Sequence, residues 1–164
     1  MRAASWLALA ALCARGARGQ AWAPLVVEPC GTPASSPGQF FATAPPGGPP
    51  GAPCKGRCVF SSAQFAGACI YSPGRDNLLY LAPCNASDTL QQYSWGGRQE
   101  GGFVSGGGGC WKDSSPSPSG AAGNVVMLGS CGYGQGQFEL LQSANNLTQV
   151  YSNISGLCID TQPV

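Results

Sequence analysis

A chain of 164 residues with 25 glycines and 14 prolines has the length of one domain and too many turn-forming residues for long helices. Its formal net charge is +1 and it has no basic tract, which argues against nucleic acid as a partner. Histidine is absent, and this excludes His-based catalytic triads and His metal sites.

The N-terminal segment has the pattern of a secretory signal peptide. Arg2 precedes an apolar run over residues 3–13, and the small residues that follow predict cleavage before Gln20. The alternative is a membrane anchor, but the run is shorter than the ~20 apolar residues that a span needs, and no later segment is long enough either. We therefore expect a signal peptide over residues 1–19 and a secreted or secretory-lumen domain over residues 20–164.

Cysteines and sequons point to the same compartment. Cleavage would remove Cys13 and leave eight cysteines, an even number that suits a disulfide framework. Three Asn-x-Ser/Thr sequons predict N-glycosylation of Asn85, Asn146 and Asn153. Zinc binding by Cys54-x3-Cys58 is an alternative, but the secretory context favours disulfides, and we expect no metal site or cofactor.

Three copies of one pattern follow, over about residues 24–71, 77–112 and 124–160. Each copy has a short apolar strand ending in cysteine, then a glutamine-aromatic element, then a cysteine followed by a bulky residue. The equivalent positions are Leu25, Leu79 and Val126; Val27, Leu81 and Leu128; Cys30, Cys84 and Cys131; Phe40, Tyr93 and Phe138; and Cys69, Cys110 and Cys158. In the first copy a Pro/Gly insertion over residues 44–53 is predicted to be an exposed loop.

The repetition predicts an all-β domain of about twelve short strands. Each copy supplies about four strands, and none can bury its apolar face alone, so the copies must share a core. Three four-stranded units around one axis form a β-trefoil. A β-sandwich is the alternative, but it would not explain the threefold repetition.

In the order of these elements the sequence resembles the ricin B-chain-type lectins, over roughly residues 24–160. The strands ending in cysteine, the element Gln91-Gln92-Tyr93 and the Cys-x-Asp element Cys158-Ile159-Asp160 carry the resemblance, whereas Gly38 and Gly136 stand where the other copies should have the first glutamine. The family's repeat normally begins at the Cys-x-Asp strand, which comes last here. The resemblance therefore implies a circularly shifted trefoil whose termini are adjacent.

The resemblance also implies the disulfides, because the family's bridge joins the Cys-x-Asp cysteine to the cysteine that ends the next strand. The implied pairs are Cys69–Cys84, Cys110–Cys131 and, across the shifted ends, Cys30–Cys158, with Cys54 and Cys58 left as a fourth pair. Alternatively, the chain is a fragment of a longer protein and Cys158 pairs with a missing segment.

Sugar sites in this family need a carboxylate, an aromatic platform and an amide. The carboxylate positions are Tyr71, Lys112 and Asp160; the platform positions are Glu28, Ala82 and Gly129; the amide positions are Val26, Tyr80 and Met127. We therefore expect at most one degenerate site, formed by Asp160 with Gln39 in reach, and a galactose-like glycan as its ligand. A turn-stabilising role for Asp160 is the alternative.

Together these features predict a secreted, lectin-like carbohydrate-binding module that is not an enzyme. The seven acidic residues are scattered, and no motif joins two of them as glycosidase chemistry would require. Two alternatives stay open. One is a structural or protein-interaction trefoil without sugar binding, and the other is an N-terminal fragment of a larger secreted glycosidase that carries this module.

Overall fold

The structure, a computed structural model, describes residues 24–52, 54, 56–74, 77–95, 103–105, 109–114, 122–130, 138–142 and 144–161. The predicted signal peptide lies outside this part. The all-β prediction is confirmed, with twelve strands in the described ranges: β1 Leu25–Glu28, β2 Phe41–Ala44, β3 Arg57–Ser62, β4 Ala68–Tyr71, β5 Tyr80–Pro83, β6 Tyr93–Trp95, β7 Phe103–Ser105, β8 Cys110–Asp113, β9 Val126–Gly129, β10 Phe138–Gln142, β11 Leu147–Ser152 and β12 Cys158–Thr161.

Helical structure in the described residues is limited to three short 3-10 turns. These are η1 Pro37–Gln39, η2 Thr89–Gln91 and η3 Ala144–Asn146. None of the helices in the described residues has the length and apolarity needed to cross a bilayer. Gly and Pro in the connections account for the small amount of helix, because they favour turns over continuous helix.

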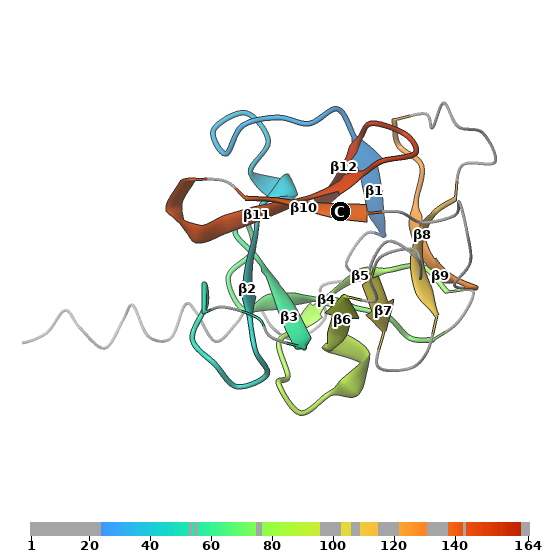
Figure 1. The fold of residues 1–164 in the computed structure, drawn as a ribbon. Coiled ribbons are helices and arrows are strands. Elements are labelled where there is room, and N and C mark those ends of the chain that lie inside the picture. Colours follow the sequence, from blue (N-terminus) through green and yellow to red (C-terminus); the bar gives the residue numbers. More distant parts are fainter. Residues whose placement is uncertain are drawn as a thin grey trace, which may run out of the picture.

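The strands form one sheet that curls back on itself. Its main path runs β1-β12-β11-β2-β3-β6-β7-β8-β9, with β10 on β11 and β4 linking β3 to β5. In β1 and β12 the two ends of the described chain pair antiparallel, from Leu25 opposite Thr161 to Glu28 opposite Cys158. Figure 1 shows these strands, blue and red, side by side.

The first strands of the three repeats pair with one another in a cycle. Isolated antiparallel bridges join Pro24 to Tyr80, Leu78 to Met127, and Val125 to Val26. Each bridge joins a residue just before one repeat's first strand to the first or second residue of another's. In this way β1 contacts β5, β5 contacts β9, and β9 contacts β1. The cycle nearly closes the sheet into a barrel-like structure.

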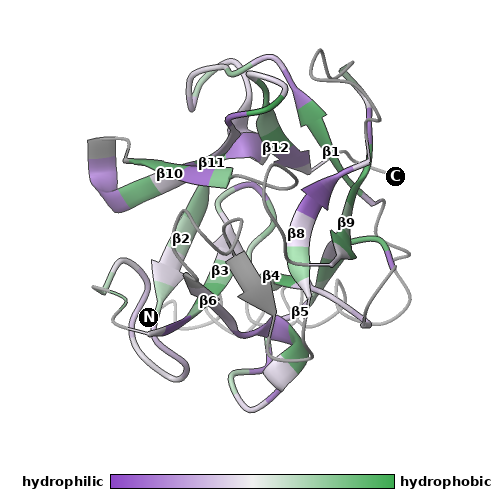
Figure 2. Cartoon of the chain, turned by 45° about the vertical axis from the view of Figure 1, so that its right-hand side comes forward, coloured by the Kyte–Doolittle hydropathy of each residue, from purple (hydrophilic) through white to green (hydrophobic). Residues whose placement is uncertain are grey.

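Equivalent side chains of these three strands meet in the core. At most 2 % of each is exposed: Leu25, Val27, Leu79, Leu81, Val126 and Leu128. In a strand, residues two apart face the same side, so each repeat supplies two of them. Figure 2 shows apolar residues concentrated along β1 and β9. Burial of this kind stabilises a fold by roughly 1.5–3 kcal/mol for each large apolar side chain.

Aromatic side chains from different repeats complete the core. Tyr93 and Trp111 have ring centroids 4.8 Å apart at 75°. Trp111 also packs on Phe60 at 5.3 Å and on Phe138 at 6.3 Å. Edge-to-face pairs such as Tyr93–Trp111 and Trp111–Phe138 contribute about 0.5–1.5 kcal/mol each beyond their buried area.

The first repeat's glutamine-aromatic element differs from the prediction by one residue. The sequence pattern pairs Gly38-Gln39-Phe40 with Gln91-Gln92-Tyr93, but η1 ends at Gln39 as η2 ends at Gln91. Likewise β2 begins at Phe41 as β6 begins at Tyr93. The aromatic equivalent to Tyr93 is therefore Phe41, and the first repeat keeps the glutamine. Phe40 and Phe41 are both buried, so hydrophobicity alone could not set the register.

Hydrogen bonds support this correction. Gln39 Oε1 accepts from Gly31 N at 2.8 Å, and Gln91 Oε1 accepts from Asn85 N at 2.8 Å. Gln39 Nε2 donates to Pro29 O, and Gln91 Nε2 donates to Pro83 O, both at 2.9 Å. Each glutamine thus closes the loop after its repeat's first strand. The third element, at Gly136, lies outside the described residues.

Three of the four expected disulfides lie wholly within the described residues. Cys30 is bonded to Cys158, Cys69 to Cys84, and Cys54 to Cys58, with Cα–Cα distances of 5.0, 4.9 and 5.7 Å. Cys110 is also disulfide-bonded, and its expected partner, Cys131, lies outside the described residues. Cys158 therefore has its disulfide partner within this chain. The bridge between Cys54 and Cys58 leaves neither of these two thiolates free to bind zinc.

Candidate functional site

Asp160 lies where the two ends of the described chain meet. It is on β12 opposite Val26 of β1, and Cys158 is opposite Glu28 two residues away. Its neighbours Ile159 and Thr161 are buried, and side chains alternate along a strand, so Asp160 faces away from the core. The carboxylate is half-buried, which leaves it accessible to solvent and to a ligand.

Gln39 contacts Asp160, as the sequence predicted. The amide Nε2 donates to Asp160 Oδ2 at 3.1 Å and to Pro29 O at 2.9 Å. The amide Oε1 accepts from Gly31 N at 2.8 Å and from Gln149 Nε2 at 3.2 Å. A primary amide has two donors and two acceptor sites, so all four are used. Gln39 is also 1 % exposed, and it therefore positions Asp160 without a group of its own to offer a ligand.

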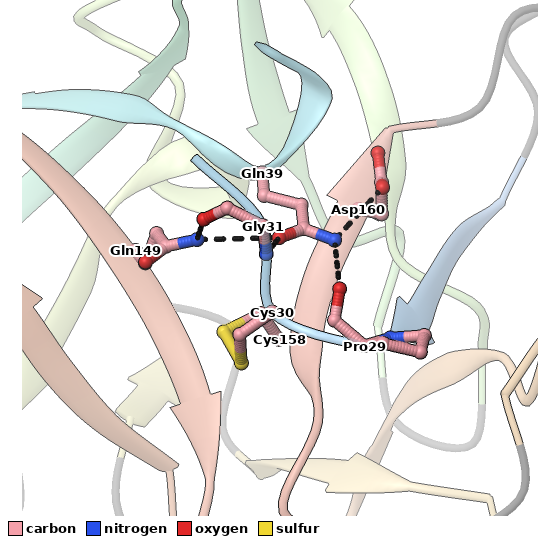
Figure 3. Close-up of a disulfide and its surroundings, with 7 residues drawn as sticks. All are labelled: Pro29, Cys30, Gly31, Gln39, Gln149, Cys158 and Asp160. Carbon is pink, nitrogen blue, oxygen red and sulfur yellow. Dashed lines mark hydrogen bonds between the residues drawn. A yellow bond between two sulfur atoms is a disulfide. The ribbon is translucent and has the colours of Figure 1, made fainter. Parts of the chain in front are cut away.

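Gln149 completes this network and was not anticipated from the sequence. It comes from β11, and its Nε2 donates to Gly31 O at 2.9 Å as well as to Gln39 Oε1. Figure 3 shows the chain of amides from Gln149 through Gln39 to Asp160, beside the Cys30–Cys158 bridge. No spacing in the sequence marks Gln149, because its partners are more than 100 positions away.

Glycine is needed at position 38 because Asp160 occupies the space beside it. A Cβ added to Gly38 would collide with Asp160 Oδ1 and would lie 2.7 Å from Gln64 Oε1 and from Thr161 O. Thr161 Oγ1 donates to Gly38 O at 3.0 Å, which fixes η1 against β12. The turn that carries Gln39 is thus held directly over the carboxylate.

The environment of Asp160 raises the pKa of its carboxyl above the ordinary value. Partial burial is the main cause, because desolvation disfavours the charged form. Hydrogen bonds from the Gln39 side chain and from the Thr161 backbone act in the opposite direction and favour the carboxylate. The group is a hydrogen-bond acceptor when ionised and becomes a donor when protonated.

The other positions taken from the resemblance lack sugar-binding chemistry. Val26 and Glu28, beside Asp160, offer neither an amide nor a flat apolar face. In the second repeat, Tyr71 and Tyr80 are paired across β4 and β5, with ring centroids 5.1 Å apart. In the third, the aliphatic stem of Lys112 lies against Gly129. Asp160 is the one acid at the three carboxylate positions.

The three sequon asparagines are all exposed. Asn85 follows Cys84 in the loop after β5, Asn146 ends η3, and Asn153 lies in the turn between β11 and β12. Each is therefore open to an attached glycan.

No protein-family model matches the sequence, and none of the curated proteins is significantly similar to it. The assignment below therefore rests on the fold and on the geometry at Asp160.

Proposed function

We propose that this protein is a secreted, ricin-B-type β-trefoil module with one degenerate sugar site, centred on Asp160. The observation that carries the proposal is a half-exposed carboxylate held by Gln39 at the junction of β1 and β12. This is the place where the resemblance puts a sugar-binding acid.

The cycle of bridges supports the trefoil. Three equivalent strands that contact one another head to tail are expected from threefold pseudosymmetry and not from two facing sheets. The bridges Cys30–Cys158 and Cys69–Cys84 occupy equivalent places in two repeats. The disulfides of the described residues also suit a secreted protein.

The chemistry supports weak sugar binding. An ionised carboxylate can accept hydrogen bonds from two vicinal hydroxyls of a galactose-like ring. Such charge-assisted bonds contribute about 1.5–3 kcal/mol each, and without an aromatic platform little else adds to them. We expect a Kd of about 1 mM, or about −4 kcal/mol.

The test is a titration of the disulfide-bonded secreted chain with galactose, lactose and N-acetylgalactosamine, followed by NMR, with a glycan array to extend the range. We expect saturable shifts that are lost in Asp160→Asn, which keeps the side chain's size and its acceptor for Gln39. Shifts that persist in Asp160→Asn would place the binding elsewhere.

A second candidate is a disulfide-bonded scaffold or protein-interaction domain. The saturation of Gln39 favours it, because Gln39, the one polar side chain that bonds Asp160 among the described residues, has no group left for a sugar. Absence of binding to every glycan at millimolar concentration would favour this candidate over the lectin.

A further inference from the structure

A shallow pocket of about 230 Å³ lies between the Pro/Gly loop and the Cys69–Cys84 disulfide. Its lining is mostly apolar: Ala44, Pro45, Gly47, Gly48, Pro50, Val59, Ser61, Cys69, Cys84 and Ala86. Pockets for drug-sized ligands hold about 300–1,000 Å³, so this one suits roughly a single sugar ring.

Two of the sequons flank this loop. Asn85 stands between Cys84 and Ala86, which both line the pocket. Asn85 Oδ1 accepts from Ser87 N at 3.1 Å, which fixes the side chain in a local turn. Asn146 lies beside the same loop, since a Cβ added to Gly51 would be 3.3 Å from Asn146 Cβ.

We propose that Asn85 carries an N-linked glycan whose first N-acetylglucosamine docks in this pocket and orders the Pro/Gly loop. In the attachment step Asn85 Nδ2 displaces the pyrophosphate from C1 of a lipid-linked oligosaccharide. An N–C bond forms, a C–O bond breaks, and the amide proton is released. The glycan is thereby tethered at the rim of the pocket, so docking needs no intermolecular association.

The chemistry of the pocket fits this occupant. The CH groups and the acetyl methyl of N-acetylglucosamine can contact Pro45, Pro50 and the disulfide, and its hydroxyls can remain in water at the open side. A proline- and glycine-rich loop has little side-chain area for a core of its own. A docked sugar supplies the missing apolar contact.

Docking should slow the local opening of the loop. The loop's own hydrogen bonds are Gly48 N to Pro45 O and Gly51 N to Thr43 O, both at 2.8 Å, and Ala52 N to Pro49 O at 3.1 Å. Their amides exchange with solvent only when the loop opens. Hydrogen exchange over residues 44–52 therefore reports docking directly.

The experiment compares three forms of the protein secreted from a glycosylating host. One form carries the whole glycan, the second is trimmed by an endoglycosidase to the first sugar, and the third has the glycan removed by an amidase. We expect exchange over residues 44–52 to be severalfold slower in the first two forms than in the third. Equal exchange in all three, or a chain unglycosylated at Asn85 by mass spectrometry, would overturn the proposal.

Two variants separate attachment from docking. Ser87→Ala removes the sequon and keeps Asn85, and it should exchange as fast as the amidase-treated form. Ala86→Leu keeps the sequon and fills the pocket from an exposed position, so it should be glycosylated yet exchange fast. Slow exchange in glycosylated Ala86→Leu would contradict docking at this pocket.

Asn153→Gln is the matched control. Leu147, at the start of β11, pairs with Ala42 close to the loop, and Asn153 follows the other end of this six-residue strand. At 3.3 Å per residue, Leu147 and Asn153 are about 20 Å apart. Exchange over residues 44–52 should therefore not change. The proposal requires passage through the secretory pathway, but it does not depend on sugar binding at Asp160.

Discussion

Gln39 Nε2 donates a hydrogen bond to Asp160 Oδ2 at 3.1 Å, although 121 positions separate the two residues. Beside this bond, the Cys30–Cys158 disulfide joins the same two parts of the chain covalently. The candidate site therefore exists only when the first and last repeats are in contact. Its geometry should respond to any change that loosens this junction.

The disulfides that close the longest and the shortest loops among those described should contribute unequally to stability. Cys30–Cys158 closes a separation of 128 residues and Cys54–Cys58 a separation of 4. The loop-entropy model gives about 5 kcal/mol for the first and about 2 kcal/mol for the second. We expect the free energy of unfolding in denaturant to fall by more in the double variant Cys30→Ala/Cys158→Ala than in Cys54→Ala/Cys58→Ala. Equal losses would show that chain entropy is not the main term.

Stability should depend on pH through Asp160. Its folded pKa is raised above the unfolded value of about 3.9, so the folded state holds the proton more tightly. This contribution is fully present below the unfolded pKa, and it is lost as pH rises through the folded pKa. Between the unfolded and the folded pKa of Asp160, we expect the unfolding free energy of the wild type to fall relative to that of Asp160→Asn as pH rises. Above the folded pKa the difference between the two proteins should be constant.

A constant difference between pH 3 and pH 7 would contradict the raised pKa. Sugar binding should follow the same group in the opposite sense, because only the carboxylate accepts two hydroxyl hydrogens. Affinity should therefore fall as pH drops below the folded pKa of Asp160.

The all-β class and the shared core could be predicted from the sequence because its pattern repeats. Leu25, Leu79 and Val126 lie at equivalent places in three copies and meet in one core, and two of the equivalent cysteine pairs are bonded as expected. A repeated pattern can be averaged over copies, so degenerate positions in one copy do not hide it. The cycle of bridges follows from the same repetition.

The details of the site could not be read in this way, because they depend on contacts that are not repeated. The one-residue shift at Gln39 arises from the loop after Cys30, which is two residues longer than the loop after Cys84. Gln149 reaches Gln39 only through the pairing of β11 with β12 and β2. The position of Gln39 and the contact of Gln149 both depend on residues that are distant in sequence and close in space. No short stretch of sequence therefore predicts them.

Gln39→Ala should destabilise the fold more than Gln91→Ala. Both variants remove two hydrogen bonds between a buried glutamine side chain and the backbone, at about 0.5–1.5 kcal/mol for each bond. Gln39→Ala also removes the bonds to Asp160 and Gln149. Chemical unfolding of both variants tests the difference, and Gln91→Ala is the matched control. A smaller loss in Gln39→Ala would show that its two additional bonds contribute nothing.

The same variant should change the acidity of Asp160. The Gln39 hydrogen bond lowers the pKa of this carboxyl, so its removal should raise the pKa further. An NMR titration of the Asp160 side-chain carboxyl in the wild type and in Gln39→Ala measures this. Gln91→Ala should leave the titration unchanged, because Gln91 belongs to a different repeat.

Gly38→Ala should distort the site while leaving most of the fold intact. The new methyl group would collide with Asp160 Oδ1 and approach Gln64 Oε1 and Thr161 O, and the latter is backbone that cannot rotate away. Overpacking of this kind costs about 1–3 kcal/mol. We expect a lower melting temperature and altered NMR shifts for Gln39 and Asp160, with little change in the Cys69–Cys84 region. Unchanged shifts at Asp160 would mean that η1 does not lie against β12 in solution, and the proposed sugar site would then lack the residue that orients its carboxylate.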